Sequence, residues 1–104
     1  MCYNSGKTMK TLDEIRDILQ SHKNDLQVKY HVKELGVFGS FARGEQGLES
    51  DVDILVEFDE PIGWEYVDLI DHLENIIGLK VDLVTPMALK RQMKDTIMKE
   101  LVQV

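Results

Sequence analysis

The segment from Asp51 to Phe58 constrains the fold most, because its side chains alternate between two faces with a period of two. Such alternation predicts a β-strand that lays one face on a core. The apolar face consists of Val52, Ile54, Val56 and Phe58. The opposite face carries Asp51, Asp53, Leu55 and Glu57, so it is mostly acidic but partly apolar. A strand of this kind needs neighbouring strands and a covering layer of helices or a second sheet.

Segments with helical periodicity lie on both sides of this strand. Thr11 to Glu14 has the spacing of a capping box, and apolar residues recur behind it, which predicts a helix over about 11–23. A second amphipathic helix is predicted from Trp64 to Ile77, closed by Gly78. Thr85 and Pro86 suit the start of a last helix, whose apolar stripe is Leu89, Met93, Ile97 and Leu101.

Two more strands complete the pattern, from Val32 to Val37 and from Lys80 to Thr85, and a short turn or helix is predicted over Ser40 to Arg43. The order of elements predicts an α/β (α+β) fold, in which helices pack on a small three-stranded mixed sheet. The directions of strand pairing do not follow from this pattern. We expect one domain over 9–104 after a ragged N-terminus at 1–8, with Met9 as a candidate natural start.

Charge and composition exclude several classes of function. The formal net charge is -7, and residues 36–85 hold twelve acidic residues against two basic ones. Such a block repels a nucleic-acid backbone, so we expect no nucleic-acid partner. No apolar run approaches the roughly 20 residues of a membrane helix, so no membrane role is expected. The single cysteine, Cys2, allows no internal disulfide and makes the reducing cytoplasm the simplest location.

Gly39 and Ser40 are the first candidate binding residues. They stand where a predicted strand ends and a short turn or helix begins. A glycine there lets backbone amides approach phosphate oxygens, and the serine hydroxyl adds a donor. A Gly-Ser pair taken alone is more often an ordinary turn.

Three aspartates are the candidate metal ligands. Asp51 and Asp53 point to one face of their strand, and two like charges on a partly apolar face favour a bound cation. Mg²⁺ prefers such carboxylate oxygens together with water and phosphate. Asp82 can join them if its strand lies beside theirs, where it would serve as a third carboxylate or a base. Solvated acids on a strand surface are the alternative.

The combination of Gly39-Ser40-Phe41-Ala42-Arg43-Gly44 with Ser50-Asp51-Val52-Asp53 and a later Asp82 closely resembles the nucleotidyltransferase superfamily that includes DNA polymerase beta. The chain looks most like the minimal nucleotidyltransferases, over about residues 11–103. The resemblance implies that Gly39 and Ser40 hold the β- and γ-phosphates of the incoming nucleoside triphosphate, with ATP expected as the substrate. It implies two Mg²⁺ ions, both held by Asp51 and Asp53, with Asp82 completing one site. Arg43 is positioned either to meet phosphate or to pair with Glu45 or Glu49.

The same resemblance implies a biological role. Many minimal nucleotidyltransferases are antitoxins of HEPN-domain toxins, and they can transfer AMP to a tyrosine of the toxin. We therefore expect transfer of AMP from ATP to a protein hydroxyl. One alternative is a binding module that neutralises its partner by covering it. Transfer to a small molecule is a further alternative, but relatives that do so generally need additional helical structure.

Other residues with functional chemistry have ordinary interpretations. The three histidines have no metal-ligand spacing, and His22 and His72 are expected on polar helix faces. Trp64 is expected to be a core or interface anchor. Core packing is expected for Met93, and a partner surface for Met87 and Met98. The small size of the chain suggests that a partner or a second copy completes the site.

Overall fold

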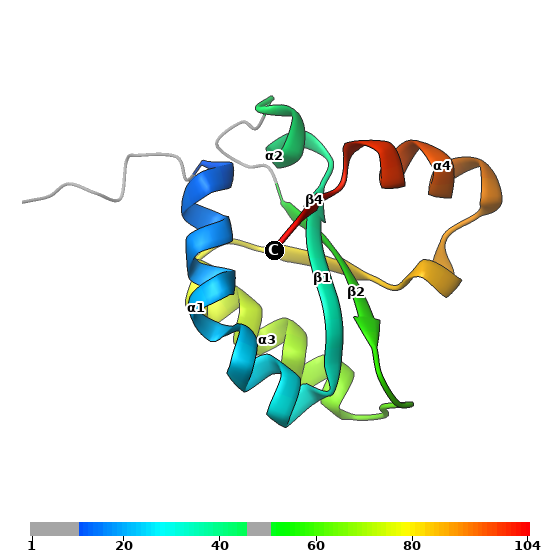
Figure 1. Cartoon of the computed structure of the whole chain (residues 1–104). Coiled ribbons are helices and arrows are strands. Elements are labelled where there is room, and N and C mark those ends of the chain that lie inside the picture. The colour runs from blue at the N-terminus through cyan, green and yellow to red at the C-terminus, as the bar shows by residue number, and fades with distance from the viewer. Residues whose placement is uncertain (1–10, 46–50) are drawn as a thin grey trace, which may run out of the picture.

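The computed structural model describes residues 11–45 and 51–104 (Figure 1). Its helices are α1 (Leu12–Tyr30), α2 (Ser40–Arg43), α3 (Glu65–Ile77) and α4 (Arg91–Glu100), with a 3₁₀ turn η2 (Pro86–Ala88). Its strands are β1 (Val32–Phe38), β2 (Val52–Phe58), β3 (Val81–Val84) and β4 (Val102–Gln103). The predicted mixture of helices and strands is therefore confirmed, and the segment predicted to be ragged, 1–8, lies outside the described residues.

The strands form one mixed sheet in the order β3-β2-β1-β4. β2 pairs antiparallel with β1 and parallel with β3, and β4 pairs antiparallel with β1. The sheet thus has four strands where three were predicted. The additional strand, β4, is only two residues long, and so short a segment carries no periodicity by which to recognise it.

Helices cover the two faces of the sheet unequally. α1 and α3 lie together on one face, and α4 lies on the other (Figure 1). The main core joins Ile15, Leu19 and Leu26 of α1 to Leu69, Leu73 and Ile77 of α3 and to Val52, Ile54 and Val56 of β2. A smaller cluster on the opposite face contains only Phe38, Leu55 and Ile97 as buried members. Leu55 is therefore buried in the same cluster as Ile97 of α4.

α1 begins as predicted but extends further. Thr11 and Glu14 form the reciprocal hydrogen bonds of a capping box. The helix continues to Tyr30, where the prediction ended near residue 23, because no helix breaker interrupts it and Leu26 extends the apolar face into the core. His31 closes the helix in a left-handed conformation, with φ of 58°.

The last helix differs most from its prediction. Pro86 starts only the 3₁₀ turn η2, Leu89 is extended, and α4 begins at Arg91. The side chain of Thr85 makes no capping hydrogen bond. The apolar stripe that was expected on one helix is therefore divided between two elements. Met93 is 51% exposed, so the prediction that it packs in the core was wrong.

Trp64 and two of the histidines differ in exposure from their predictions. Trp64 is 87% exposed, so it is not a core residue, and only an interface role remains of the prediction. His22 and His72 do not lie on open polar faces; both are half-buried, and their rings meet edge to face between α1 and α3. Within the residues that the structure describes, no helix is both long enough and apolar enough to cross a membrane.

Candidate functional site

A glycine turn brings the end of β1 against β2. Gly39 has φ of 77° and ψ of -151°, a conformation that side-chain-bearing residues rarely adopt. Phe38 pairs with Asp53 across the two strands, and a Cβ atom on Gly39 would collide with the Asp53 carboxylate. Glycine is therefore required here so that the turn can lie against the acid. Ser40, the next residue, opens α2 and is half-buried.

The strand of Asp82 lies directly beside the strand of Asp53. β2 and β3 run parallel, and Asp53 and Asp82 are Cα partners in that pair. Their neighbours in each strand are buried on the side of α1 and α3, so both aspartates belong to the other face. Asp51 is exposed and precedes β2 by one residue. The condition set by the sequence for Asp82 to lie beside Asp53 is thus met. Among the described residues, however, Asp51, Asp53 and Asp82 do not form a group whose ligand atoms all lie within 4.8 Å of one another.

Crowding of acids alters the titration of Asp53. Burial, followed by the negative charges of Asp82 and Asp51, raises the pKa of this carboxyl from 3.8 to about 6. Arg43 acts in the opposite direction, and Glu100 adds to the increase. Because burial and nearby negative charges disfavour the ionised form of Asp53, a cation bound beside it would stabilise that form strongly.

Arg43 lies at the end of α2 and contacts two carboxylates. Its Nε donates to Glu45 at 3.1 Å, and its Nη1 donates to both carboxylate oxygens of Glu100, at 3.0 and 3.3 Å. Hydrogen bonds to Glu45 and then Glu100 raise the pKa of the guanidinium. Of the two roles that the sequence left open for Arg43, pairing with Glu45 is observed, while Glu49 lies outside the described residues.

Glu100 is a site residue that the sequence did not indicate. It is the last residue of α4, and its Oε1 accepts the backbone N–H of Gly39 at 3.0 Å. One carboxylate therefore binds both the glycine turn and Arg43. No local pattern announces this role, because Glu100 and Gly39 are 61 positions apart in the sequence.

Tyr66 is a second residue that sequence reasoning missed. Its hydroxyl donates to the backbone carbonyl of Leu83 at 2.5 Å, which joins the first turn of α3 to β3. Burial and the charge of Asp82 raise the pKa of this phenol. Tyr66 thus responds to the acidic site from the neighbouring helix.

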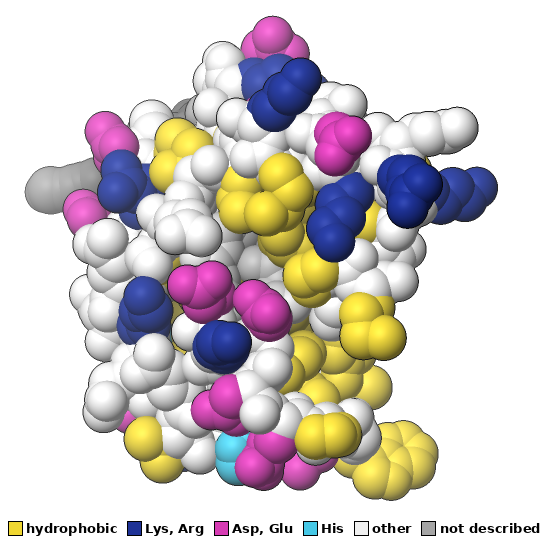
Figure 2. Space-filling view, turned by 45° about the vertical axis from the view of Figure 1, so that its right-hand side comes forward, with side chains coloured by type: hydrophobic (Ala, Val, Ile, Leu, Met, Phe, Trp, Pro, Cys, Tyr) yellow, Lys and Arg dark blue, Asp and Glu magenta, His cyan; other side chains and the backbone are white. Residues whose placement is uncertain are grey.

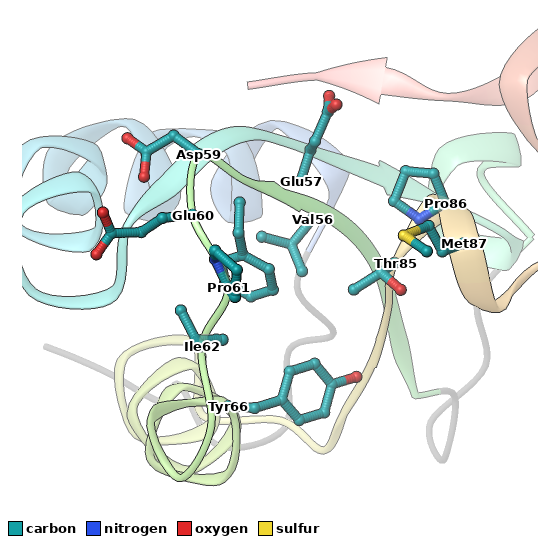
Figure 3. A pocket seen from close by; sticks show the side chains of 11 residues that line it. Val56, Glu57, Asp59, Glu60, Pro61, Ile62, Tyr66, Thr85, Pro86 and Met87 are labelled. Carbon is teal, nitrogen blue, oxygen red and sulfur yellow. The ribbon is translucent and has the colours of Figure 1, made fainter.

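Tyr66 also lines a hollow of about 590 Å³ at the ends of β2 and β3. Its wall is mainly apolar, and Asp59 and Glu60 extend away from it at one side (Figure 3). The lining residues are Val56, Glu57, Phe58, Asp59, Glu60, Pro61, Ile62, Tyr66, Thr85, Pro86 and Met87. Figure 2 shows hydrophobic side chains running down one side of this face with acidic side chains beside them. Met87 is 97% exposed.

A separate acidic group lies at the far end of β2. His31 Nε2 is 3.2 Å from Glu60 Oε1, and His31 Nδ1 is 3.9 Å from Asp59 Oδ1. Among residues 11–45 and 51–104, this is the one trio of histidine and acidic ligand atoms that all lie within 4.8 Å of one another. The trio is exposed, a setting in which acids commonly gather without an ion, and it is remote from Asp53 along the strand.

The arrangement around Asp53 has the chemistry of a cation and phosphate site. Asp51, Asp53 and Asp82 supply hard oxygen donors of the kind that Mg²⁺ prefers. The like charges that raise the pKa of Asp53 leave local negative charge that a divalent ion would offset. Gly39 and Arg43 supply donors next to these acids, although Glu100 accepts hydrogen bonds from both. The donor set therefore fits a divalent cation that accompanies a phosphorylated ligand.

Comparisons of the sequence with known proteins agree with this chemistry. The family described as "Nucleotidyltransferase domain" matches residues 12–104. A Methanocaldococcus jannaschii protein, provisionally named a protein adenylyltransferase, is 52% identical over 100 residues, which cover 92% of this chain and all of the relative. The protein adenylyltransferase MntA of Thermococcus cleftensis is 46% identical over 97 residues, which cover 92% of this chain and 98% of the relative.

Solved structures match the fold. A structure provisionally named a minimal nucleotidyltransferase aligns with a TM-score of 0.79 and 29% identity, over 95% of this chain and all of that one. A toxin–antitoxin structure with AMP-PNP aligns with a TM-score of 0.64 and 20% identity, over 90% of this chain and 72% of that one. A structure of a tri-AMPylated Shewanella oneidensis HEPN toxin in complex with an MNT antitoxin aligns with a TM-score of 0.54 and 17% identity, over 88% of this chain and 66% of that one.

The last two likenesses concern the fold alone, whereas the family match and the relatives establish kinship over nearly the whole chain. Membership of this family favours a nucleotide substrate and a divalent metal. The chain belongs to the nucleotidyltransferase domain family, as one of its minimal, MntA-like enzymes.

Proposed function

We propose that this enzyme transfers AMP from ATP, in the presence of Mg²⁺, to a hydroxyl group of a partner protein. The observation that carries the proposal is the position of Asp53, which lies beside Asp82 in the sheet and directly against the Gly39 turn. Two relatives similar over almost their full length bear the name protein adenylyltransferase, one of them provisionally, which favours AMP and a protein acceptor.

Asp51, Asp53 and Asp82 would hold two Mg²⁺ ions, and Gly39, Ser40 and Arg43 would bind the β- and γ-phosphates. Bound Mg²⁺ supplies positive charge that stabilises the entering and leaving oxygens of a phosphoryl transfer. The acceptor hydroxyl oxygen forms a bond to the α-phosphorus, and the bond from that phosphorus to the bridging oxygen breaks. Pyrophosphate leaves with the bonding electron pair. Asp82 would take the hydroxyl proton.

The same chemistry explains why metal should be required for nucleotide binding. Asp53 lies beside Asp82 and against the Gly39 turn, and Arg43 is already paired with two acids. Free ATP is itself strongly anionic, so it would be repelled by this cluster.

A binding titration tests the site. Wild type is expected to bind ATP with Mg²⁺ and to lose most of that affinity when EDTA removes the metal. The double variant Asp51→Asn/Asp53→Asn should lose the increase in affinity that Mg²⁺ gives to wild type. Asp59→Asn is a suitable control, because Asp59 is an exposed acid at the other end of β2. Equal binding by the double variant would mean that the site has been misassigned.

For the partner, we propose a HEPN-type toxin, which makes this chain an antitoxin in the cytoplasm. The support is that solved toxin–antitoxin complexes, one with an AMPylated HEPN toxin, share this fold. Incorporation of label from α-labelled ATP into the co-expressed toxin is expected for wild type and should be absent for Asp53→Asn. Label in the toxin with that variant would refute the catalytic assignment.

The hollow beside Tyr66 is the proposed contact surface for this partner. Its wall is apolar and its charged rim residues, Glu57, Asp59 and Glu60, are all acidic, so it suits an apolar side chain flanked by lysine or arginine. Met87→Glu should weaken the complex in a pull-down with the toxin. Val28→Glu is the control: it places the same charge at a position on α1 that is 70% exposed, and it should not weaken the complex.

A second candidate function is neutralisation by occlusion, favoured by the exposed Trp64 and Met87. The two functions separate in a cell-protection assay with Asp51→Asn/Asp53→Asn. Loss of protection supports transfer of AMP as the protective event, and full protection supports coverage of the toxin. A partner or second copy of the chain could complete the acceptor site, and transfer by an isolated monomer to a small acceptor would argue against this.

A further inference from the structure

We propose that Glu100 acts as an internal competitor of the triphosphate. Its carboxylate occupies the hydrogen-bond donors that would bind the phosphates, until the nucleotide displaces it. The inference rests on the proposed function, because it takes the turn at Gly39 and the guanidinium of Arg43 to be the phosphate-binding donors. It adds a residue of α4 whose effect on nucleotide affinity is opposite in sign to that of the aspartates.

The contacts of Glu100 carry the argument. Its carboxylate accepts the Gly39 N–H at 3.0 Å and two hydrogen bonds from Arg43 Nη1. A carboxylate and a phosphate bind the same kinds of donor, an amide N–H and a guanidinium, in similar geometry. Glu100 occupies the single Gly39 N–H and the Nη1 group of Arg43, so a phosphate group that takes these same hydrogen bonds must replace the carboxylate.

The two acids on Arg43 differ in how firmly they are held. The side chain of Glu45 is 67% exposed and its contact is a surface ion pair, whereas that of Glu100 is 20% exposed and binds two partners. Glu100 is therefore the contact that most limits access to the guanidinium. The charge of Glu100 is itself in an unfavourable place, because Glu100 is the last residue of α4 and the dipole of a helix disfavours a carboxylate at its C-terminus.

The anchoring of α4 permits such an exchange. Val102 follows closely and pairs with Val37 of β1, while Ile97 is the buried residue of α4 in the small cluster on this face. The chain on the C-terminal side of Glu100 thus stays fixed in the sheet when its side chain moves. Displacement needs a change in one side chain and the last helical turn, without opening of the main core.

The consequence for binding is quantitative. If only the fraction of molecules with Glu100 displaced can bind phosphate, the apparent dissociation constant is increased by the inverse of that fraction. Removal of the carboxylate should abolish this penalty. We expect Glu100→Gln to bind Mg²⁺-ATP about tenfold more tightly than wild type, and Glu100→Ala to bind at least as tightly as Glu100→Gln.

Calorimetric titrations of the full chain with Mg²⁺-ATP and with Mg²⁺-tripolyphosphate test this. The control is Asp95→Asn, which removes one negative charge from an exposed position on the same helix and should leave both affinities within about twofold of wild type. Tighter binding by Glu100→Gln, with no change in Asp95→Asn, supports the inference. Unchanged or weaker binding by both Glu100 variants overturns it and makes Glu100 a supporting residue of the turn.

A measurement on wild type guards against a variant that fails to fold. Addition of Mg²⁺-tripolyphosphate should shift both the Gly39 amide and the Glu100 side-chain carboxyl in NMR spectra, because their hydrogen bond is lost. Saturation without a change at Glu100 would refute the exchange.

The two ligands separate this inference from the proposed function. If tripolyphosphate binds more tightly to Glu100→Gln while ATP binds to no variant, the competitor role stands and the nucleotide assignment fails. If ATP binds equally to wild type and Glu100→Gln, the site stands and the competitor role fails. If neither ligand binds to any variant, Glu100 is not what closes the site, and the inference is also refuted.

Discussion

At the scale of single residues, the site depends on a carboxyl group whose charge is disfavoured. Burial and two neighbouring aspartates raise the pKa of Asp53 to about 6, and this group is one of the proposed metal ligands. Protons and metal therefore compete for it near neutral pH. A metal bound there should favour the ionised form and lower the pKa.

Carbon NMR of the Asp53 carboxyl checks this competition. In EDTA, the resonance should titrate near pH 6, and saturating Mg²⁺ should move the midpoint to lower pH. Mg²⁺ affinity should accordingly fall as pH drops through 6. A midpoint that Mg²⁺ does not change would show that Asp53 is not a ligand.

Gly39 offers a second test at this scale. Gly39→Ala introduces a residue at positive φ and also a Cβ that collides with Asp53. Gly44→Ala is a matched control, since Gly44 has φ of 72° and open space around the missing Cβ. We expect Gly44→Ala to cost about 1 kcal/mol of unfolding free energy and Gly39→Ala roughly 1 kcal/mol or more beyond that, measured by urea unfolding.

The two variants should also differ in nucleotide binding. Gly39→Ala should lose Mg²⁺-dependent ATP affinity because the displaced carboxylate belongs to the site. Gly44→Ala should keep it. Equal costs in stability and equal ATP affinities would contradict the close approach of Gly39 to Asp53.

At the scale of elements, α4 is the least firmly held of the long helices. α1 and α3 each bury three residues in the main core, whereas α4 buries Ile97 alone. Its position above Leu55 nevertheless decides where Glu100 meets the Gly39 turn. Local opening of α4 is therefore expected to cost less than global unfolding.

Ile97→Ala should loosen this helix selectively. Removal of the buried side chain should cost about 2 kcal/mol and accelerate amide exchange in α4 more than in α1. Met93→Ala, on the same helix but half-exposed, should change stability by less than about 0.5 kcal/mol. Uniform acceleration throughout the protein would instead mean that α4 unfolds with the main core.

At the scale of the whole molecule, the acidic site lowers the free energy of unfolding at neutral pH when no metal is bound. The raised pKa means that folded Asp53 holds its proton more tightly than unfolded Asp53. Its contribution to stability is thus present at low pH and is lost as pH rises through about 6. The twelve acids in residues 36–85 repel one another, and this repulsion also opposes folding.

Thermal unfolding of Asp53→Asn tests this balance. Without metal, the variant should match wild type near pH 4 and exceed it in melting temperature at pH 7, because it lacks the opposed charge. Mg²⁺ should stabilise wild type by about 1.4 kcal/mol at ten times its Kd and have a smaller effect on the variant. A variant that melts below wild type at pH 7 without metal would contradict the repulsion inferred here.

The sequence by itself determined the class of the fold and the identity of the acidic residues. Period-two alternation in β2 and helical periodicity in α1 and α3 are local patterns, so the order of residues along the chain is enough to reveal them. The capping box at Thr11 and the closing glycine of α3 are local as well. The spacing from Gly39 to Asp53 sufficed to indicate a resemblance to nucleotidyltransferases, which the family match and the relatives confirm.

The tertiary structure alone decided what depends on contacts between distant segments. The pairing of β3 with β2, which puts Asp82 beside Asp53, follows from the topology and not from any local pattern. The two-residue β4 forms because β1 offers it hydrogen bonds. The contact of Glu100 with Gly39 and Arg43 joins residues 57 and 61 positions apart, and such a contact exists only once α4 has packed on the sheet.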